Sequence, residues 1–254
     1  MVDSLPLPGR SVRLRVGCAG WSIATAHQPL FGEGDSMLER YATRFDAVEI
    51  NSSFHRPHQH RTYERWAAAV PRHFRFAVKL PRQISHEAQL HRSGPLLDTF
   101  LEQADGLGSK LSVLLLQLPP SLALDARMAA TFFGVLRRRW SGAVACEPRH
   151  ASWFGEAAGS LLQRHRIARV AADPALHPGA GSPGGASSLR YWRWHGSPRV
   201  YYSPYADGAL QTLATQVTST SRARTEAWVI FDNTAHGHAA PDALRLCRLI
   251  QKAG

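Results

Sequence analysis

Short apolar runs recur along the chain, and helical patterns of apolar and polar residues separate most of them. The runs cover residues 12–20, 47–51, 75–80, 111–118, 143–149, 168–173, 191–196 and 227–233. Eight strand-like runs alternating with helical segments over 254 residues predict an α/β fold of the (β/α)₈, or TIM, barrel type. Such a barrel takes about 250 residues as one unit, so we expect a single domain over residues 12–254 after a loose leader at 1–11.

Helical spacing predicts the outer layer of this barrel. Ser36 is the expected N-cap of the first helix, and further helices are expected near 62–70, 96–105, 126–140, 154–164, 210–218 and 243–252. The stretch 177–188 is rich in Gly, Pro and Ser, which do not sustain a regular helix. We therefore expect the outer helix after the sixth strand to be short or missing.

Alternation within the strands predicts which side chains face the barrel axis. In the fifth run, Ala143, Ala145, Glu147 and Arg149 share one face, and bulkier apolar residues share the other. The other strands repeat this pattern, and helices must cover the bulky apolar face. The residues predicted to share one polar enclosure are Glu49, Lys79, Glu147, Arg149, Arg193 and His195. Buried charges are unfavourable alone, so these groups must pair, be hydrated or meet a ligand.

Ligands of such barrels bind at the C-terminal ends of the strands, a region called the mouth below. The candidate ligand-binding residues there are Trp21, Asn51, Lys79, Gln117, Arg149, Asp173, Arg193 and Asn233. Glu49, Glu147 and His195 are the candidate catalytic acids and bases, since carboxylates and imidazole exchange protons near neutral pH. We expect a small polar ligand with at least one carboxylate or phosphate, because three of the inward groups are cationic.

Short motifs along nearly the whole chain resemble the YecE-like family, domain of unknown function seventy-two. They are GCAGWS at 17–22, EINSSF at 49–54, FAVK at 76–79, QLPP at 117–120, EPRH at 147–150, RWHG at 193–196 and FDNT at 231–234, together with Trp153 and Asp173. The resemblance implies a TIM-barrel fold and no particular reaction. Asp232 stands where the family more often has asparagine.

Several chemistries remain open for the mouth, among them hydrolase, isomerase and lyase reactions. Glu49 and Glu147 on opposite sides of the barrel would suit inverting glycoside hydrolysis, or each could form an ion pair with an inward cation. Lys79 could be a Schiff-base nucleophile if desolvated, although two neighbouring glutamates argue for a protonated lysine. Asp173 and His195 could join the glutamates around a divalent ion, but cations compete for the carboxylates, so we assign no metal and identify no cofactor.

The composition bears on partners and compartment. The net charge of +11, from 30 Lys and Arg against 19 Asp and Glu, keeps nucleic-acid binding open as an alternative, along with a non-catalytic ligand-binding barrel. The basic residues are spread along the chain and form no reader motif, so we do not favour nucleic acid. No run approaches the ~18 apolar residues of a membrane span, and the three cysteines show no metal-type spacing. We expect a cytoplasmic protein without a membrane partner; the oligomeric state stays open.

Overall fold

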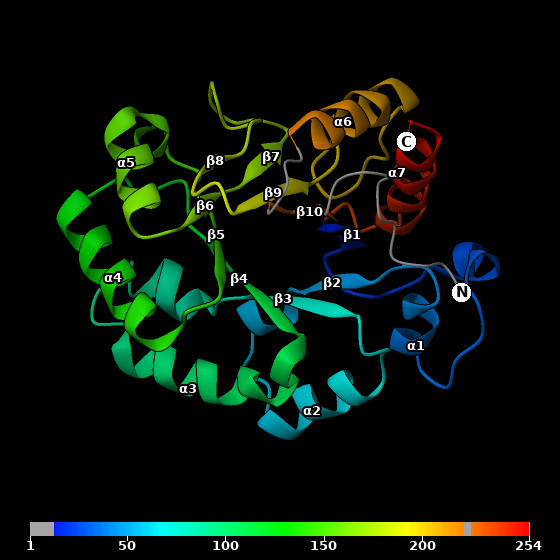
Figure 1. Cartoon of the computed structure of the whole chain (residues 1–254), viewed down its shortest axis with the longest axis horizontal. Coiled ribbons are helices and arrows are strands. Elements are labelled where there is room, and N and C mark those ends of the chain that lie inside the picture. The colour runs from blue at the N-terminus through cyan, green and yellow to red at the C-terminus, as the bar shows by residue number, and fades with distance from the viewer. Residues whose placement is uncertain (1–12, 221–224, 254) are drawn as a thin grey trace.

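The strands of the computed structural model, which describes residues 13–220 and 225–253, form two sheets that together make the wall of a TIM barrel (Figure 1). One sheet has the order β1 (Arg13–Cys18), β10 (Glu226–Phe231), β9 (Leu189–Trp194) and β7 (Ala171–Asp173). The other has the order β2 (Ala47–Ile50), β3 (Arg75–Lys79), β4 (Leu111–Gln117), β5 (Ala143–Glu147), β6 (Ala168–Arg169) and β8 (Gly184–Gly185). All neighbouring strands are parallel except β8, which runs antiparallel to β6.

Two short connections join the sheets. A parallel bridge links Ala19, just after β1, to Glu49 of β2. On the other side, β6 leads directly into β7 after the single residue Val170, so residues 168–173 act as one strand shared by both sheets. The eight strand-like runs predicted from the sequence are confirmed.

The helices lie around the outside of the strands (Figure 1). They are α1 (Met37–Ala42), α2 (His60–Ala68), α3 (Gly94–Ala104), α4 (Ala126–Arg139), α5 (Glu156–Arg164), α6 (Asp207–Thr220) and α7 (Ala239–Ala253). No helix lies between β7 and β9, a segment the structure describes throughout, which confirms the prediction of a missing outer helix. None of the helices in residues 13–220 and 225–253 has the length and apolar character needed to cross a membrane. The leader expected at 1–11 lies outside the described residues.

Local sequence signals explain where helices begin. Ser36 caps α1 as predicted: its hydroxyl accepts a hydrogen bond from the backbone N–H of Glu39, and the Glu39 carboxylate accepts one from the backbone N–H of Ser36. Asp125 caps α4 through the N–H of Met128. These caps satisfy N–H groups that have no partner within the helix.

Two separate apolar clusters place the polar site. The larger lies between strands and helices, and the smaller fills the barrel interior and includes Ala47, Ala77 and Ala145. Each of those alanines lies two residues before a charged side chain of the same strand face, namely Glu49, Lys79 and Glu147. The apolar interior therefore ends in a layer of charged groups at the mouth.

Candidate functional site

Arg193 of β9 is the centre of a buried ion-pair network. Its guanidinium is fully buried and donates to Glu49 at 2.7 Å, to Glu147 at 2.7 Å and to Asp232 at 2.9 Å. The three carboxylates come from β2, from β5 and from the residue after β10. They raise the pKa of Arg193 well above its ordinary value, although burial alone would lower it.

Glu49 is enclosed by this arrangement. Its carboxylate accepts hydrogen bonds from Arg193 and, at 2.8 Å, from the hydroxyl of Tyr191, and the side chain has no exposed surface. Because the guanidinium of Arg193 also binds Glu147, it occupies the space between the two glutamates. Both glutamates therefore form ion pairs with an inward cation, which is one of the two alternatives that the sequence left open. The guanidinium leaves no room between them for the sugar of an inverting glycosidase.

His195 of β9 lies between two carboxylates. Its Nε2 is 3.0 Å from Glu147 and its Nδ1 is 3.0 Å from Asp232. Burial alone would lower the pKa of His195, but the two carboxylates raise it above its ordinary value. Both ring nitrogens then carry protons and donate, so the 3.3 Å approach of Arg149 to Nε2 is not a hydrogen bond.

Glu147 has the most partners. Besides Arg193 and His195, it accepts from Arg149 at 3.0 Å and from the amide of Gln117 at 3.2 Å. Burial alone would raise the pKa of Glu147, but Arg193, His195 and Arg149 together hold it well below its ordinary range. The pKa of Asp232 is also lowered, because Arg193 and His195 outweigh its burial. Both groups are therefore anionic at neutral pH.

Lys79, the last residue of β3, is different. It is only 5% exposed, and within residues 13–220 and 225–253 its ammonium forms neither a hydrogen bond nor an ion pair. Its Nζ lies 4.0 Å from the centre of the Phe54 ring. Burial, with a further contribution from Arg193, lowers the pKa of Lys79 to about 8.

Arg149 and His86 are the titratable neighbours on the outer side of Lys79. The ring of His86 packs edge-on against Phe54 at 4.9 Å. Burial lowers the pKa of His86, and the charges of Lys79 and Arg149 lower it further. Lys79 and Arg149 are therefore the positive groups beside the buried network, and the lowered pKa of His86 favours its neutral form.

The charges at the mouth do not balance. We call Glu49, Glu147, Arg149, Arg193, His195 and Asp232 the mouth cluster. Its three carboxylates are paired with three cations, since Arg193 and His195 bind two or more of them and Arg149 binds Glu147. Lys79 is a fourth cation, and among the described residues it has no carboxylate partner.

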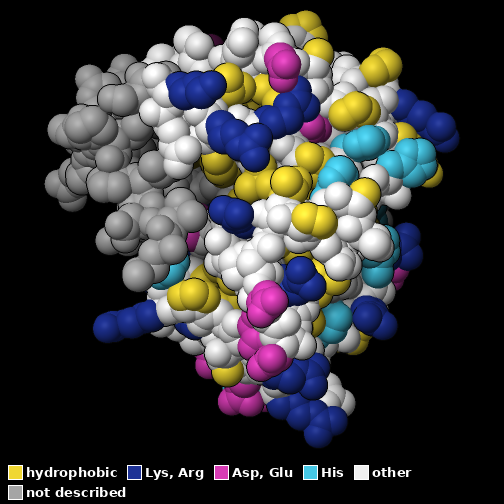
Figure 2. Space-filling model, turned by 90° about the vertical axis from the view of Figure 1, so that its right-hand side faces the viewer, with side chains coloured by type: hydrophobic (Ala, Val, Ile, Leu, Met, Phe, Trp, Pro, Cys, Tyr) yellow, Lys and Arg dark blue, Asp and Glu magenta, His cyan; other side chains and the backbone are white. Residues whose placement is uncertain are grey.

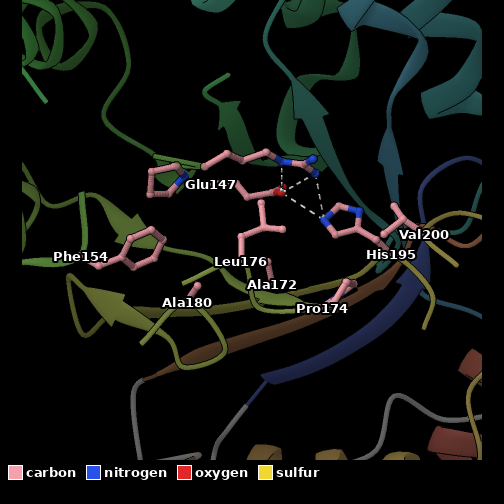
Figure 3. Close-up of a pocket in the computed structure, with 10 residues that line it drawn as sticks. Glu147, Phe154, Ala172, Pro174, Leu176, Ala180, His195 and Val200 are labelled. Atoms are coloured by element: carbon pink, nitrogen blue, oxygen red, sulfur yellow. Dashed lines mark hydrogen bonds and ion pairs between the residues drawn. The ribbon is translucent and has the colours of Figure 1, made fainter. Parts of the chain in front are cut away.

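A pocket opens beside the cluster (Figure 3). Its cavity volume is about 30 Å³ and it opens to solvent, and its polar side is formed by Glu147, Arg149 and His195. The other side is apolar; it comprises Pro148, Phe154, Ala172, Pro174, Leu176, Ala180 and Val200. The pocket therefore suits a small molecule with one charged and one apolar side.

The structure brings some predicted site residues together and separates others. Gln117 joins the mouth cluster through Glu147, but Asp173 accepts instead from the hydroxyl of Tyr205 at 2.8 Å. Asn233 donates to Asp242 at 2.8 Å, away from the barrel axis.

Trp21 and Asn51 also lie outside the cluster. Trp21 packs edge-on against Trp66 of α2 at 5.0 Å. Asn51 follows β2 at the mouth, and within the described part of the chain its buried Oδ1 accepts no hydrogen bond. This Oδ1 is a polar atom for which a ligand could supply the missing donor.

Two members of the network, Tyr191 and Asp232, were not predicted. Strand alternation could have found both: Tyr191 shares the inward face with Arg193 and His195, and Asp232 continues the inward positions of Trp228 and Ile230. The same rule puts Asn233 on the outer face.

The metal-ion and nucleic-acid alternatives raised by the sequence depend on the donor sets and on the distribution of basic side chains. In the described ranges, no three His, Cys, Asp or Glu residues converge to hold a metal ion. On the face shown in Figure 2, Lys and Arg side chains lie in separate groups, with acidic, histidine and uncharged side chains between them.

Comparison with known proteins agrees with the sequence motifs and the barrel. The family model described as protein of unknown function DUF72 matches residues 15–254. The UPF0759 protein YecE of Escherichia coli K12 is 32% identical over 104 residues, which cover 41% of this chain and 37% of YecE.

Two crystal structures of DUF72 family proteins have the same fold. The one from Thermotoga maritima has a TM-score of 0.76 and 25% identity, covering 94% of this chain and 99% of the other. The one from Enterococcus faecalis has a TM-score of 0.76 and 22% identity, covering 94% and 95%. The chain belongs to the DUF72 family.

Proposed function

We propose that the mouth of the barrel binds a small ligand with a carboxylate or phosphate group, and that Lys79 and Arg149 hold this anion. One observation carries the proposal: Lys79 is 5% exposed and has no ion-pair partner within residues 13–220 and 225–253, beside a cluster whose carboxylates are already paired. A buried charge without a partner is costly, and a ligand anion would remove that cost.

Arg149 is the second anion-binding group. Its Nε and Nη2 bind Glu147, whereas its Nη1 makes no hydrogen bond within residues 13–220 and 225–253. The side chain is 21% exposed and lines the pocket. A guanidinium with a free edge is well suited to a planar carboxylate or a phosphate.

The other charged groups have different roles in this proposal. Glu49 and Arg193 are fully enclosed, so they position their neighbours and do not touch the ligand. His195 lines the pocket and is protonated, which makes it the group available to give a proton to a bound ligand. The apolar wall around Phe154 and Leu176 would contact a short carbon chain.

Binding of inorganic phosphate and of pyruvate, followed by calorimetry and by thermal shift at fixed salt, tests the proposal. We expect saturable binding that weakens about 10- to 100-fold in Lys79→Met and in Arg149→Met, because each loses a charge-assisted contact of about 1.5–3 kcal/mol. Arg138→Met is the matched control, since Arg138 is an exposed arginine of α4.

Two results would overturn the proposal. The first is that neither phosphate nor pyruvate binds saturably. The second is an equal loss of affinity in Arg138→Met and in Lys79→Met, which would locate binding on the general basic surface, as in the nucleic-acid alternative.

A further inference from the structure

The chain has three lysines, Lys79, Lys110 and Lys252, and they lie in three different environments. Lys252 is exposed near the end of α7. The ammonium of Lys110 donates to the carbonyl oxygens of Ala67 and Val70, each at 2.6 Å. Lys79 is the buried lysine whose Nζ has no hydrogen-bond acceptor in the described ranges.

A free, unprotonated nitrogen is what an amine nucleophile needs. Neighbouring carboxylates would keep Lys79 protonated, but Glu49, Glu147 and Asp232 each bind Arg193. Arg193 itself adds a repelling positive charge. With a pKa of about 8, about one in ten of the Lys79 side chains is neutral at pH 7. The lysine is therefore mostly protonated at pH 7, but its neutral fraction is far larger than at the ordinary pKa of 10.5.

We propose that Lys79 is a nucleophilic amine that forms an imine with a small carbonyl compound carrying a carboxylate, such as a 2-oxo acid. This inference rests on the proposed function, because Arg149 would hold the carboxylate. Lys79 ends β3 and Arg149 follows the end of β5 by two residues, on either side of β4. Adjacent strands are about 4.8 Å apart, so the two strand ends are about 10 Å apart, and long side chains from both can reach one small ligand.

The step balances without a further reagent. The lone pair of Nζ attacks the carbonyl carbon, a C–N bond forms, and the carbonyl electron pair moves to the oxygen, which takes the proton released by the nitrogen. The resulting carbinolamine takes a second proton, supplied by water at the mouth, and loses water to give a protonated imine. Hydrolysis reverses the step and releases the free amine.

Reductive trapping tests the inference on the whole protein. Pyruvate and cyanoborohydride are added, and the adducts are mapped by intact mass and peptide mass spectrometry. We expect one adduct, on Lys79, formed at least about tenfold faster than any adduct on Lys252, because burial lowers the pKa of Lys79 to about 8. Its rate should rise with pH up to about 8. Lys110 and Lys252 are internal controls, and Lys79→Met should abolish the adduct.

Binding measurements with lactate, pyruvate and phosphate separate this inference from the proposed function. Lactate carries the carboxylate without the carbonyl, so it should compete with pyruvate for binding and leave no adduct. Saturable pyruvate binding without an adduct on Lys79, or with adducts formed equally on Lys252, would overturn the imine and leave the anion site standing. No saturable binding of pyruvate or phosphate would overturn both.

Discussion

Each end of the barrel holds a buried arginine, and the two arginines have different surroundings. At the N-terminal end, Arg15 of β1 binds Asp46 at 2.9 Å and Glu226 at 3.2 Å. These carboxylates are 22% and 28% exposed, so water reaches them. At the mouth, Arg193 and its three carboxylate partners are at most 5% exposed.

The difference lies in what balances each group of charges. At the N-terminal end the carboxylates outnumber the arginine, and solvent can stabilise the excess negative charge. At the mouth the excess is the positive charge of Lys79, which is buried and has no carboxylate to pair with. The first arrangement stabilises the fold, whereas the second retains an unfavourable charge that a ligand could use.

Arg193→Met should have the largest effect. It leaves three buried carboxylates without their shared cation, so we expect the free energy of unfolding to fall by about 3–5 kcal/mol. Urea denaturation measures this loss, and Arg138→Met at an exposed site should change stability by less than about 0.5 kcal/mol. If Arg193→Met lowered the free energy of unfolding by no more than Arg138→Met does, the ion pairs of Arg193 would not stabilise the mouth as described.

Arg15→Met should cost less, about 1.5–3 kcal/mol by the same measurement. Its partners Asp46 and Glu226 remain partly hydrated when the arginine is removed. A loss equal to or greater than that of Arg193→Met would mean that the two ends do not differ as described.

Lys79→Met should stabilise the protein by about 1–3 kcal/mol at pH 7, while it weakens anion binding. The pKa of Lys79 is about 8 in the folded protein, below its ordinary 10.5, so folding disfavours the charged form. The gain is full below pH 8 and shrinks as pH rises to 10.5, where the lysine is losing its charge in the unfolded chain as well. Urea denaturation between pH 6 and 10 checks this, and a destabilised variant at pH 7 would contradict it.

His195→Gln should have a smaller, pH-dependent effect. The folded pKa of His195 is raised above its ordinary 6.5, so its favourable contribution is present below pH 6.5 and is lost as pH rises through the folded pKa. In that window the stability of the unmodified protein should fall relative to the variant, by about 1 kcal/mol per pH unit. If the difference in the free energy of unfolding between the two proteins did not change with pH, His195 would have the same protonation in the folded and the unfolded chain.

The amino-acid sequence predicts the barrel and much of its mouth because both follow from strand periodicity. Eight apolar runs define the strands, and alternation brings Glu49, Glu147, Arg193 and His195 together. Pairing could not be predicted, because it depends on where side chains end in space. The example is Arg193, which binds Glu49, Glu147 and Asp232 at once.

The residues that follow the strands show the other limit of sequence reasoning. The chain turns at Gly20, whose φ of +97° favours glycine, and Trp21 packs on α2 instead of over the barrel axis. Asp173 follows Ala172, which lines the pocket, and so faces the other way, toward Tyr205. The position of a residue just after a strand is therefore a weaker guide to membership of the mouth cluster than the face of the strand on which the residue lies.

A titration of the three lysines by NMR, with carbon-13 at the ε position, tests whether Lys79 is a buried cation without a partner. We expect a midpoint of about 8 for Lys79, against its ordinary 10.5. A midpoint at or above 10.5 would show that its charge is already compensated, and would contradict the account.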